Sequence, residues 1–167
     1  MLRAPIAVLA MVTLSWAAHL AVFTSTLPER VATHFGLAGA PDGWMSKAAF
    51  VTFSVSILAF VIVVFVSSGS LFRILPRGLI NVPNRDYWLA PERRAGAARL
   101  FMRWMLWALS GLVAFLTGVN HLVWQANART PPRLHESGFI VLLAVFLVAS
   151  VAWVALLFRA FAVPRDR

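Results

Sequence analysis

The stretch Leu27–Lys47, LPERVATHFGLAGAPDGWMSK, lies between the first two of four long apolar segments. None of these segments contains lysine, arginine, aspartate or glutamate, and they cover Ala4–Pro28, Ala48–Phe72, Trp104–Ala128 and Ser137–Phe158. A helix needs about 20 apolar residues to cross the hydrocarbon core of a bilayer, and it satisfies its own backbone hydrogen bonds, as lipid requires. The sequence therefore predicts an all-α integral membrane bundle of four transmembrane helices.

The composition also points to a membrane. Of the 167 residues, 60% are hydrophobic and 13% are charged, whereas a soluble domain has about 25% charged residues. We expect a single membrane domain over residues 1–167. Its predicted parts are spans at about 5–26, 47–68, 102–125 and 138–159, outer loops at 27–46 and 126–137, and a cytoplasmic loop at 69–101. The first apolar segment is longer than the core of a typical signal peptide, so we expect it to remain as a span.

The orientation follows from the lysines and arginines. Eleven of them lie on the side that holds both chain termini and the loop at 69–101, and four lie on the other side. Loops rich in lysine and arginine stay in the cytoplasm. Both termini are therefore predicted to be cytoplasmic. On this basis the net charge of +9 is a topology signal and an attraction to anionic lipid headgroups, and no nucleic-acid partner is expected.

Local signals predict how the Leu27–Lys47 stretch is organised. Ser46 is predicted as the N-cap of the second span. Pro28 is expected to open a short helical turn through 29–34, and the chain is expected to reverse at Gly36, Gly39 and the Pro41–Gly43 turn. Trp44 is then placed at the level of the lipid headgroups.

The third span is expected to belong to a longer helix. Pro91 and Glu92 are typical of a first helical turn, and a helix from there would run for about 35 residues, or about 52 Å. Its first turns must project beyond a hydrocarbon core of about 30 Å. Ser110, Ala114 and Gly118 recur every four residues, a pattern of small residues that favours helix packing. We therefore expect this helix at the centre of the bundle.

The residues that could carry chemistry gather near the outer face. The candidates for ligand or partner binding are His34, Asp42, Trp44, Lys47, His19 and His121. Histidine and carboxylate groups can hold zinc or relay protons, and an ionisable group within a span is a functional hypothesis. No HExxH or HxH pair is present, however, so hydrogen bonds that pack the helices explain His19 and His121 equally well. Whether a metal binds stays open.

No catalytic residue and no cofactor are expected. The chain has no cysteine, which excludes a disulfide, a thiolate metal site and a cysteine nucleophile. The nucleotide and nucleophile motifs GxxxxGK[ST], GxGxxG and GxSxG are also absent.

A second dense motif lies in the predicted cytoplasmic loop. It is formed by Tyr87, Trp88, Pro91, Glu92 and Arg93 within the sequence YWLAPERR. One interpretation is a docking surface for a cytoplasmic partner. The other, which we favour, is an anchor at the membrane interface, with the aromatic rings among the headgroups and the arginines reaching toward water.

Two stretches carry a resemblance to a known family. LPERVATHFGLAGAPDGWMSK, placed directly after a first span, and NVPNRDYWLAPERR resemble the bacterial domain of unknown function 1648 family. The first also resembles the N-terminal part of the SdpI-type immunity proteins, which neutralise a secreted toxic peptide. The resemblance implies no catalytic role, and the positions that it marks are Pro28, His34, Phe35, Gly39, Pro41, Asp42, Gly43, Trp44 and Lys47.

These observations predict a non-enzymatic protein of the bacterial inner membrane whose outer loop senses or binds something outside, as in toxin immunity or envelope signalling. Its expected partners are the lipid bilayer, an extracytoplasmic peptide or protein, and a second copy of the chain. The alternative is a small transporter or a metal-dependent membrane enzyme that uses the outer histidines.

Overall fold

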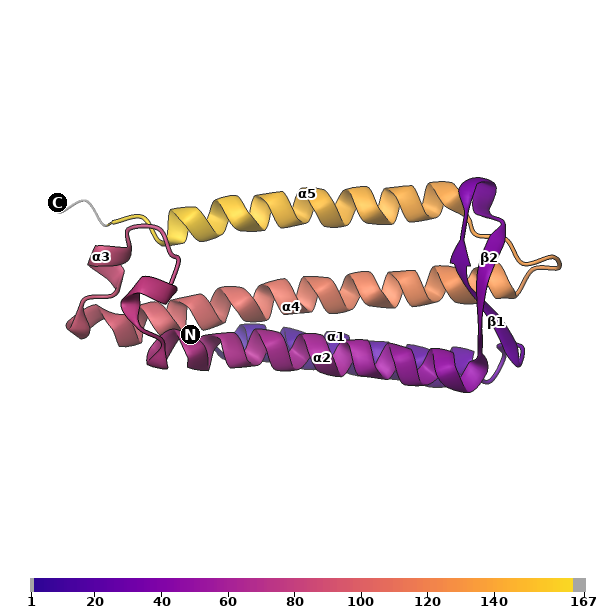
Figure 1. The fold of residues 1–167 in the computed structure, drawn as a ribbon, viewed down its shortest axis with the longest axis horizontal. Coiled ribbons are helices and arrows are strands. Elements are labelled where there is room, and N and C mark those ends of the chain that lie inside the picture. The colour runs from indigo at the N-terminus through magenta and orange to yellow at the C-terminus, as the bar shows by residue number, and fades with distance from the viewer. Residues whose placement is uncertain (1, 164–167) are drawn as a thin grey trace.

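Four long helices lie side by side in the computed structural model, which describes residues 2–163 (Figure 1). They are α1 (Arg3–Thr24), α2 (Lys47–Ile74), α4 (Pro91–Asn127) and α5 (Glu136–Ala160). Each is long and apolar enough to cross a membrane, which confirms four helices of that kind. A short helix, α3 (Arg85–Trp88), and a 3-10 turn, η2 (Arg77–Leu79), lie between α2 and α4.

The fold is not purely helical, because a β-hairpin stands where a loop with a helical turn was predicted. Strand β1 (Arg30–Phe35) pairs antiparallel with β2 (Pro41–Ser46). The chain reverses between them through the 3-10 turn η1 (Leu37–Gly39). The predicted helical turn at 29–34 is therefore wrong. The predicted reversal is confirmed at Gly36 and Gly39 but wrong at 41–43, since these residues belong to β2. Alternating residues such as Val31 and Thr33 suit a half-buried strand, and pairing with β2 overrides the helix-starting preference of the preceding proline.

The end of the hairpin was predicted correctly. The Ser46 hydroxyl accepts a hydrogen bond from the Ala49 backbone N–H at 3.2 Å, so Ser46 is the N-cap of α2. Helix α2 thus begins directly where β2 ends. We call the end of the bundle that carries β1 and β2 the hairpin end, and the opposite end, where residues 75–90 lie, the basic end.

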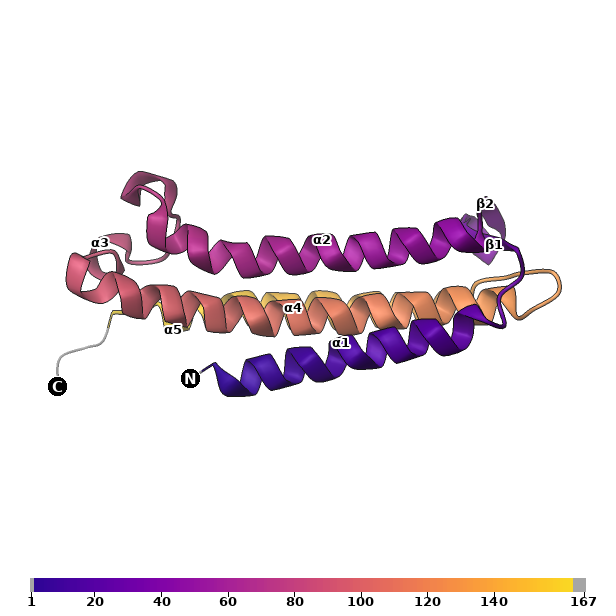
Figure 2. The ribbon, with the colours of Figure 1, turned by 90° about the horizontal axis from the view of Figure 1, so that it is seen from below.

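Helix α4 is the centre of the bundle, as expected. It packs against α1, α2 and α5, and α1 and α2 lie on opposite sides of it (Figure 2). Only part of the stripe formed by Ser110, Ala114 and Gly118 lies in contacts between helices. Ser110 is buried, and a side chain at Gly118 would come within 2.9 Å of Leu142 on α5, whereas Ala114 is exposed.

The hairpin lies across the ends of the helices (Figure 1). Among residues 2–163, its hydrogen bonds to α4 are made by one side chain, that of Asn127. The Asn127 amide accepts from the Ala32 N–H at 2.8 Å and donates to the Ala32 carbonyl at 2.9 Å. It also donates to the carbonyl of Val123 at 2.8 Å. Asn127 therefore pairs with β1 as a neighbouring strand would. It satisfies the backbone N–H and C=O of Ala32, which is fully buried.

The far tip of the hairpin is held by the segment between α4 and α5. The Leu134 N–H donates to the Gly39 carbonyl at 3.0 Å, and Arg133 Nε donates to the Ala38 carbonyl at 3.1 Å. Gly39 has a φ of 68°, and a side chain there would come within 2.6 Å of the Leu134 carbonyl oxygen. Only glycine suits this position, because it accepts both the left-handed backbone and the close approach.

The anchoring role of Asn127 can be tested by hydrogen exchange. Replacing Asn127 with alanine leaves the buried N–H and C=O of Ala32 without partners, so we expect the free energy of opening the hairpin to fall by about 2 kcal/mol. The matched control is Asn120→Ala on the same helix, because the Asn120 side chain makes no hydrogen bond within residues 2–163. Equal exchange rates in the two variants would contradict the anchor.

Candidate functional site

The hairpin has a buried face and an outward face. Val31 is fully buried in the core between the helices, and Phe35 packs against the same core. Arg30 and His34 alternate with them along β1 and are exposed on the opposite face. The apolar residues therefore hold the hairpin in place, and the polar ones face outward.

Two side-chain pairs occupy the outward face. The Arg30 guanidinium lies over the Trp44 ring at 5.2 Å from its centroid. The imidazole Nδ1 of His34 is within hydrogen-bonding distance of the Asp42 carboxylate, and 76% and 53% of the two side chains are exposed. Both pairs are accessible to a molecule that approaches the hairpin end.

Irregular strand pairing produces the pair between His34 and Asp42. The register of β1 and β2 shifts between Ala32 and His34, and again between His34 and Phe35. His34 lies opposite Gly43, where an added side chain would come within 2.7 Å of the His34 Cβ. The glycine in the sequence PDGW is thus required by the closeness of β1, and the bulge brings Asp42 beside the imidazole.

Lys47 closes the base of the hairpin. Its ammonium lies 3.0 Å from a carboxylate oxygen of Glu29, and its N–H donates to the Glu29 carbonyl at 2.9 Å. The Glu29 side chain is 90% exposed, so the ion pair contributes less than about 1 kcal/mol. Lys47 is the first residue after β2, and Glu29 is the last residue before β1, so this contact joins the two open ends of the hairpin.

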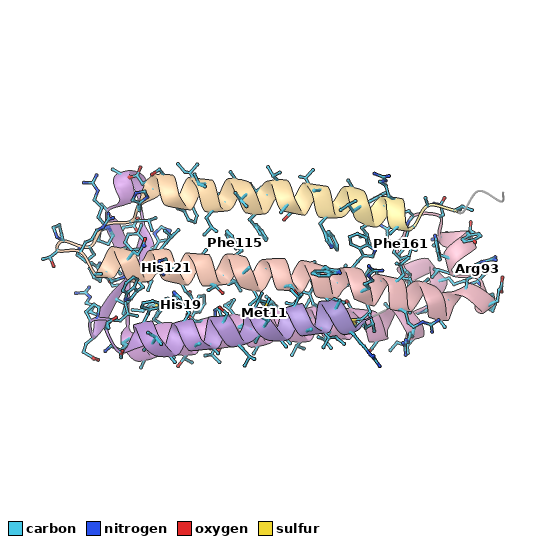
Figure 3. The ribbon with its side chains drawn as sticks, turned by 180° about the vertical axis from the view of Figure 1, so that it is seen from behind. Met11, His19, Arg93, Phe115, His121 and Phe161 are labelled. Atoms are coloured by element: carbon cyan, nitrogen blue, oxygen red, sulfur yellow. The ribbon has the colours of Figure 1, made fainter. Side chains whose placement is uncertain are left out.

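His19 and His121 meet between α1 and α4 (Figure 3), with 3.1 Å between His19 Nε2 and His121 Nδ1. Gln125 Nε2 lies 3.0 Å from His121 Nε2. If the Gln125 amide donates to His121, then His121 Nδ1–H donates to His19, and both rings are neutral. Phe23 packs beside the two imidazoles, with its ring centroid 4.3 Å from that of His19. This arrangement satisfies two polar side chains within helices that are apolar enough to cross a membrane.

The structure does not bring the outer histidines and acids into one site. His34 pairs with Asp42 on the hairpin, and His19 pairs with His121 between the helices. Within residues 2–163, no group of three or more histidine, aspartate or glutamate side chains is placed to hold a metal ion. The geometry supports two separate pairs, one exposed and one between helices.

At the basic end, the motif of Tyr87, Trp88, Pro91, Glu92 and Arg93 makes contacts within the protein. Arg93 lies over the Tyr87 ring at 4.2 Å, donates to the Tyr87 carbonyl at 2.9 Å, and pairs with Glu92 at 3.1 Å. The Trp88 indole donates to the carbonyl of Phe161 at 2.8 Å, and Pro91 is the first residue of α4. The motif therefore ties the start of α4 to the end of α5.

Several residues that complete these contacts had no distinguishing signal in the sequence. Asn84 also donates to the Phe161 carbonyl at 2.8 Å, and Phe161 is fully buried. The Arg94 guanidinium donates to the carbonyls of Phe72 and Leu75 at the end of α2. Arg94 thus satisfies carbonyl groups that a helix end leaves free. Both Asn84 and Arg94 lie within the stretch NVPNRDYWLAPERR, but nothing in that stretch shows which carbonyl groups they reach.

A double-mutant cycle tests whether the two span histidines interact. For His19→Ala and His121→Ala we expect a coupling free energy of about 0.6 kcal/mol, and no more than about 1.7 kcal/mol, because hydrogen bonds between membrane helices are weak. The control cycle pairs His34→Ala with His121→Ala and should be additive within about 0.5 kcal/mol, since the two side chains share no partner. Stoichiometric zinc in the purified protein, lost in His34→Ala, would instead favour a metal site.

One part of this chain matches a known protein family. The search of curated proteins and the search of solved structures each found no match. The matching family model is described as Domain of unknown function (DUF1648), and it aligns with residues 10–65. This region begins within α1, contains the whole β-hairpin and ends within α2. Residues 10–65, with the hairpin at their centre, therefore match the DUF1648 family.

Proposed function

We propose that this protein is a non-enzymatic protein of the bacterial cytoplasmic membrane that binds an extended peptide outside the membrane, along strand β2 of the hairpin. The observation that carries the proposal is the open backbone edge of β2 at Trp44, opposite the edge of β1 that Asn127 closes. The exposed polar pairs of the hairpin supply side-chain contacts beside this edge.

The orientation rests on the distribution of charge between the two ends of the bundle. The hairpin end carries Arg30, Lys47, Arg129 and Arg133. Nine described arginines lie at the basic end: Arg3, Arg73, Arg77, Arg85, Arg93, Arg94, Arg99, Arg103 and Arg159. The excess of positive charge favours a cytoplasmic basic end and an outward-facing hairpin.

The ladder of hydrogen bonds gives the direction of the backbone groups. Lys47 N–H bonds to the carbonyl of Glu29 directly opposite, so this is a hydrogen-bonded pair. In an antiparallel ladder such pairs alternate with pairs whose N–H and C=O point away from the partner strand. Counting along the register places Ala32 and Trp44 in a pair of the second kind. The Asn127 amide takes the outward groups of Ala32, which agrees with this count.

The equivalent groups of Trp44 are free. Among residues 2–163, neither the N–H nor the C=O of Trp44 has a hydrogen-bond partner outside the ladder. An unpaired strand edge is a template on which an extended peptide adds as a further strand. The buried face of the hairpin is already occupied by the helices, so the added strand would lie beside β2 and not beneath it.

Side chains next to this edge would select the peptide. Trp44 is 38% exposed and offers a large apolar surface, and Asp42 precedes it on the same strand. A peptide that pairs with β2 therefore needs an apolar residue near Trp44 and tolerates a basic residue near Asp42. A secreted membrane-active peptide has this character, so toxin immunity or envelope signalling is the class of function that we propose.

The orientation has a direct test in living cells. A reporter enzyme that is active only outside the cytoplasm should be active when fused after Arg129 and inactive when fused after Arg85. The opposite pattern would place the hairpin in the cytoplasm and overturn the proposed orientation.

Photo-crosslinking tests whether the hairpin has a peptide partner. A photoreactive residue at position 44 should give an adduct with a peptide in cells, whereas the same residue at Leu14, an exposed apolar position of α1, should not. An adduct with a second copy of the chain would replace the proposed partner by a dimer. The absence of any adduct specific to position 44 would remove the support for binding at this edge.

The binding mode is tested by a pair of substitutions at the same position. Trp44→Phe keeps the backbone N–H, and Trp44→Pro removes it without deleting a ladder hydrogen bond. We expect the recovery of the crosslinked peptide on copurification to be near the wild-type level in the first variant and to fall about tenfold in the second. Equal recovery in two folded variants would show that strand addition is not the mode of binding.

A further inference from the structure

A second cleft opens at the hairpin end, away from the outward face of the hairpin. It lies between the end of α4 and the start of α5 and has a volume of about 580 Å³. Its polar lining comes from Gln125, Arg129 and His135, and its apolar lining includes Leu122 and Trp124. None of the contacts that fix the hairpin uses the Arg129 or His135 side chain.

Two side chains of this cleft, Arg129 and His135, present donors, and the Gln125 amide is already paired with His121 through its Nε2. His135 is the N-cap of α5, and its Nδ1 accepts the Gly138 N–H at 3.0 Å. The proton of the neutral ring is therefore on Nε2, which is free to donate. The Arg129 guanidinium donates one long hydrogen bond, 3.5 Å from Nη1 to the Arg133 carbonyl, and it has no carboxylate partner within residues 2–163. The nearby Glu136 carboxylate lies beside Gly39 at the hairpin tip. Donors without a matching acceptor favour an anion.

The depth of the cleft indicates which anion. The apolar part of α4 from Trp104 to Trp124 rises about 30 Å, which matches the hydrocarbon thickness of a bilayer. With this segment in the hydrocarbon core, Arg129 after α4 and His135 before α5 come at the level of the lipid phosphates. Trp124 on the wall of the cleft is the kind of residue that lies at this interface.

We infer that this cleft binds the headgroup of an anionic phospholipid in the leaflet on the hairpin side. The Arg129 guanidinium donates to the phosphate, and His135 Nε2–H supplies a second donor. Leu122 and Trp124 contact the first carbons of the lipid. This site is independent of the peptide-binding edge of β2, because the two surfaces share no residue.

The neighbouring arginines provide a matched test. The purified protein is reconstituted with phosphatidylglycerol or phosphatidylethanolamine, and bound lipid is counted by native mass spectrometry. We expect Arg129→Gln to lower phosphatidylglycerol retention about tenfold, the loss of one charge-assisted hydrogen bond. Arg133→Gln removes the same charge but belongs to a side chain bonded to the hairpin tip, so it should retain the lipid.

The histidine is tested without losing its structural role. Asparagine is a good N-cap, so His135→Asn preserves the bond to the Gly138 N–H while removing the Nε2 donor. We expect a several-fold loss of phosphatidylglycerol at an unchanged melting temperature. Equal losses in Arg129→Gln and Arg133→Gln, or equal retention of the two lipids by the wild-type protein, would overturn the inference. Displacement of the lipid by millimolar inorganic phosphate would assign the cleft to a free anion and overturn it as well.

Discussion

The structure depends on the two hydrogen bonds between the Asn127 amide and the backbone of Ala32. A strand that lies on a helical bundle brings backbone N–H and C=O groups into a region where water does not reach them, and each unpaired group there costs about 1–3 kcal/mol. Asn127 supplies one donor and one acceptor at the end of α4. The side chain of a helix thereby completes a sheet edge, and the hairpin is held where its apolar residues close the core.

The same requirement is met at the basic end by different side chains. Arg94 donates to carbonyls at the end of α2, and Trp88 and Asn84 donate to the carbonyl of Phe161 after α5. Arg94 belongs to α4, and Trp88 ends α3, three residues before α4 begins, so the central helix and the segment that leads into it organise this end of the bundle. This explains why α4 is longer than the bilayer requires: its first turns serve as a scaffold for the segment between α2 and α4.

The helices could be predicted from the sequence because lipid leaves few alternatives to a charge-free segment of this length. The start of α4 at Pro91 and the N-cap at Ser46 depend on local preferences and were also predictable. The hairpin was not, because a six-residue strand is stabilised by its pairing with β2 and by Asn127, which lies 95 positions away from Ala32. The pairs of His34 with Asp42 and of His19 with His121 were hidden for the same reason, since no sequence spacing shows which side chains meet across elements.

The two ligand surfaces that we propose follow from an asymmetry in how backbone and side-chain groups are satisfied. Asn127 closes one edge of the hairpin, so the edge at Trp44 is the one on which a further strand can be added. Arg133 is bonded to the hairpin tip, whereas Arg129 makes only a 3.5 Å hydrogen bond to the Arg133 carbonyl, so the other donors of Arg129 are available to an anion. In each case, one of two similar groups is bonded within the fold, and the other is the one that we propose for the ligand. A group bonded within the fold serves stability, whereas an equivalent group left free beside it at the membrane surface is available to a ligand.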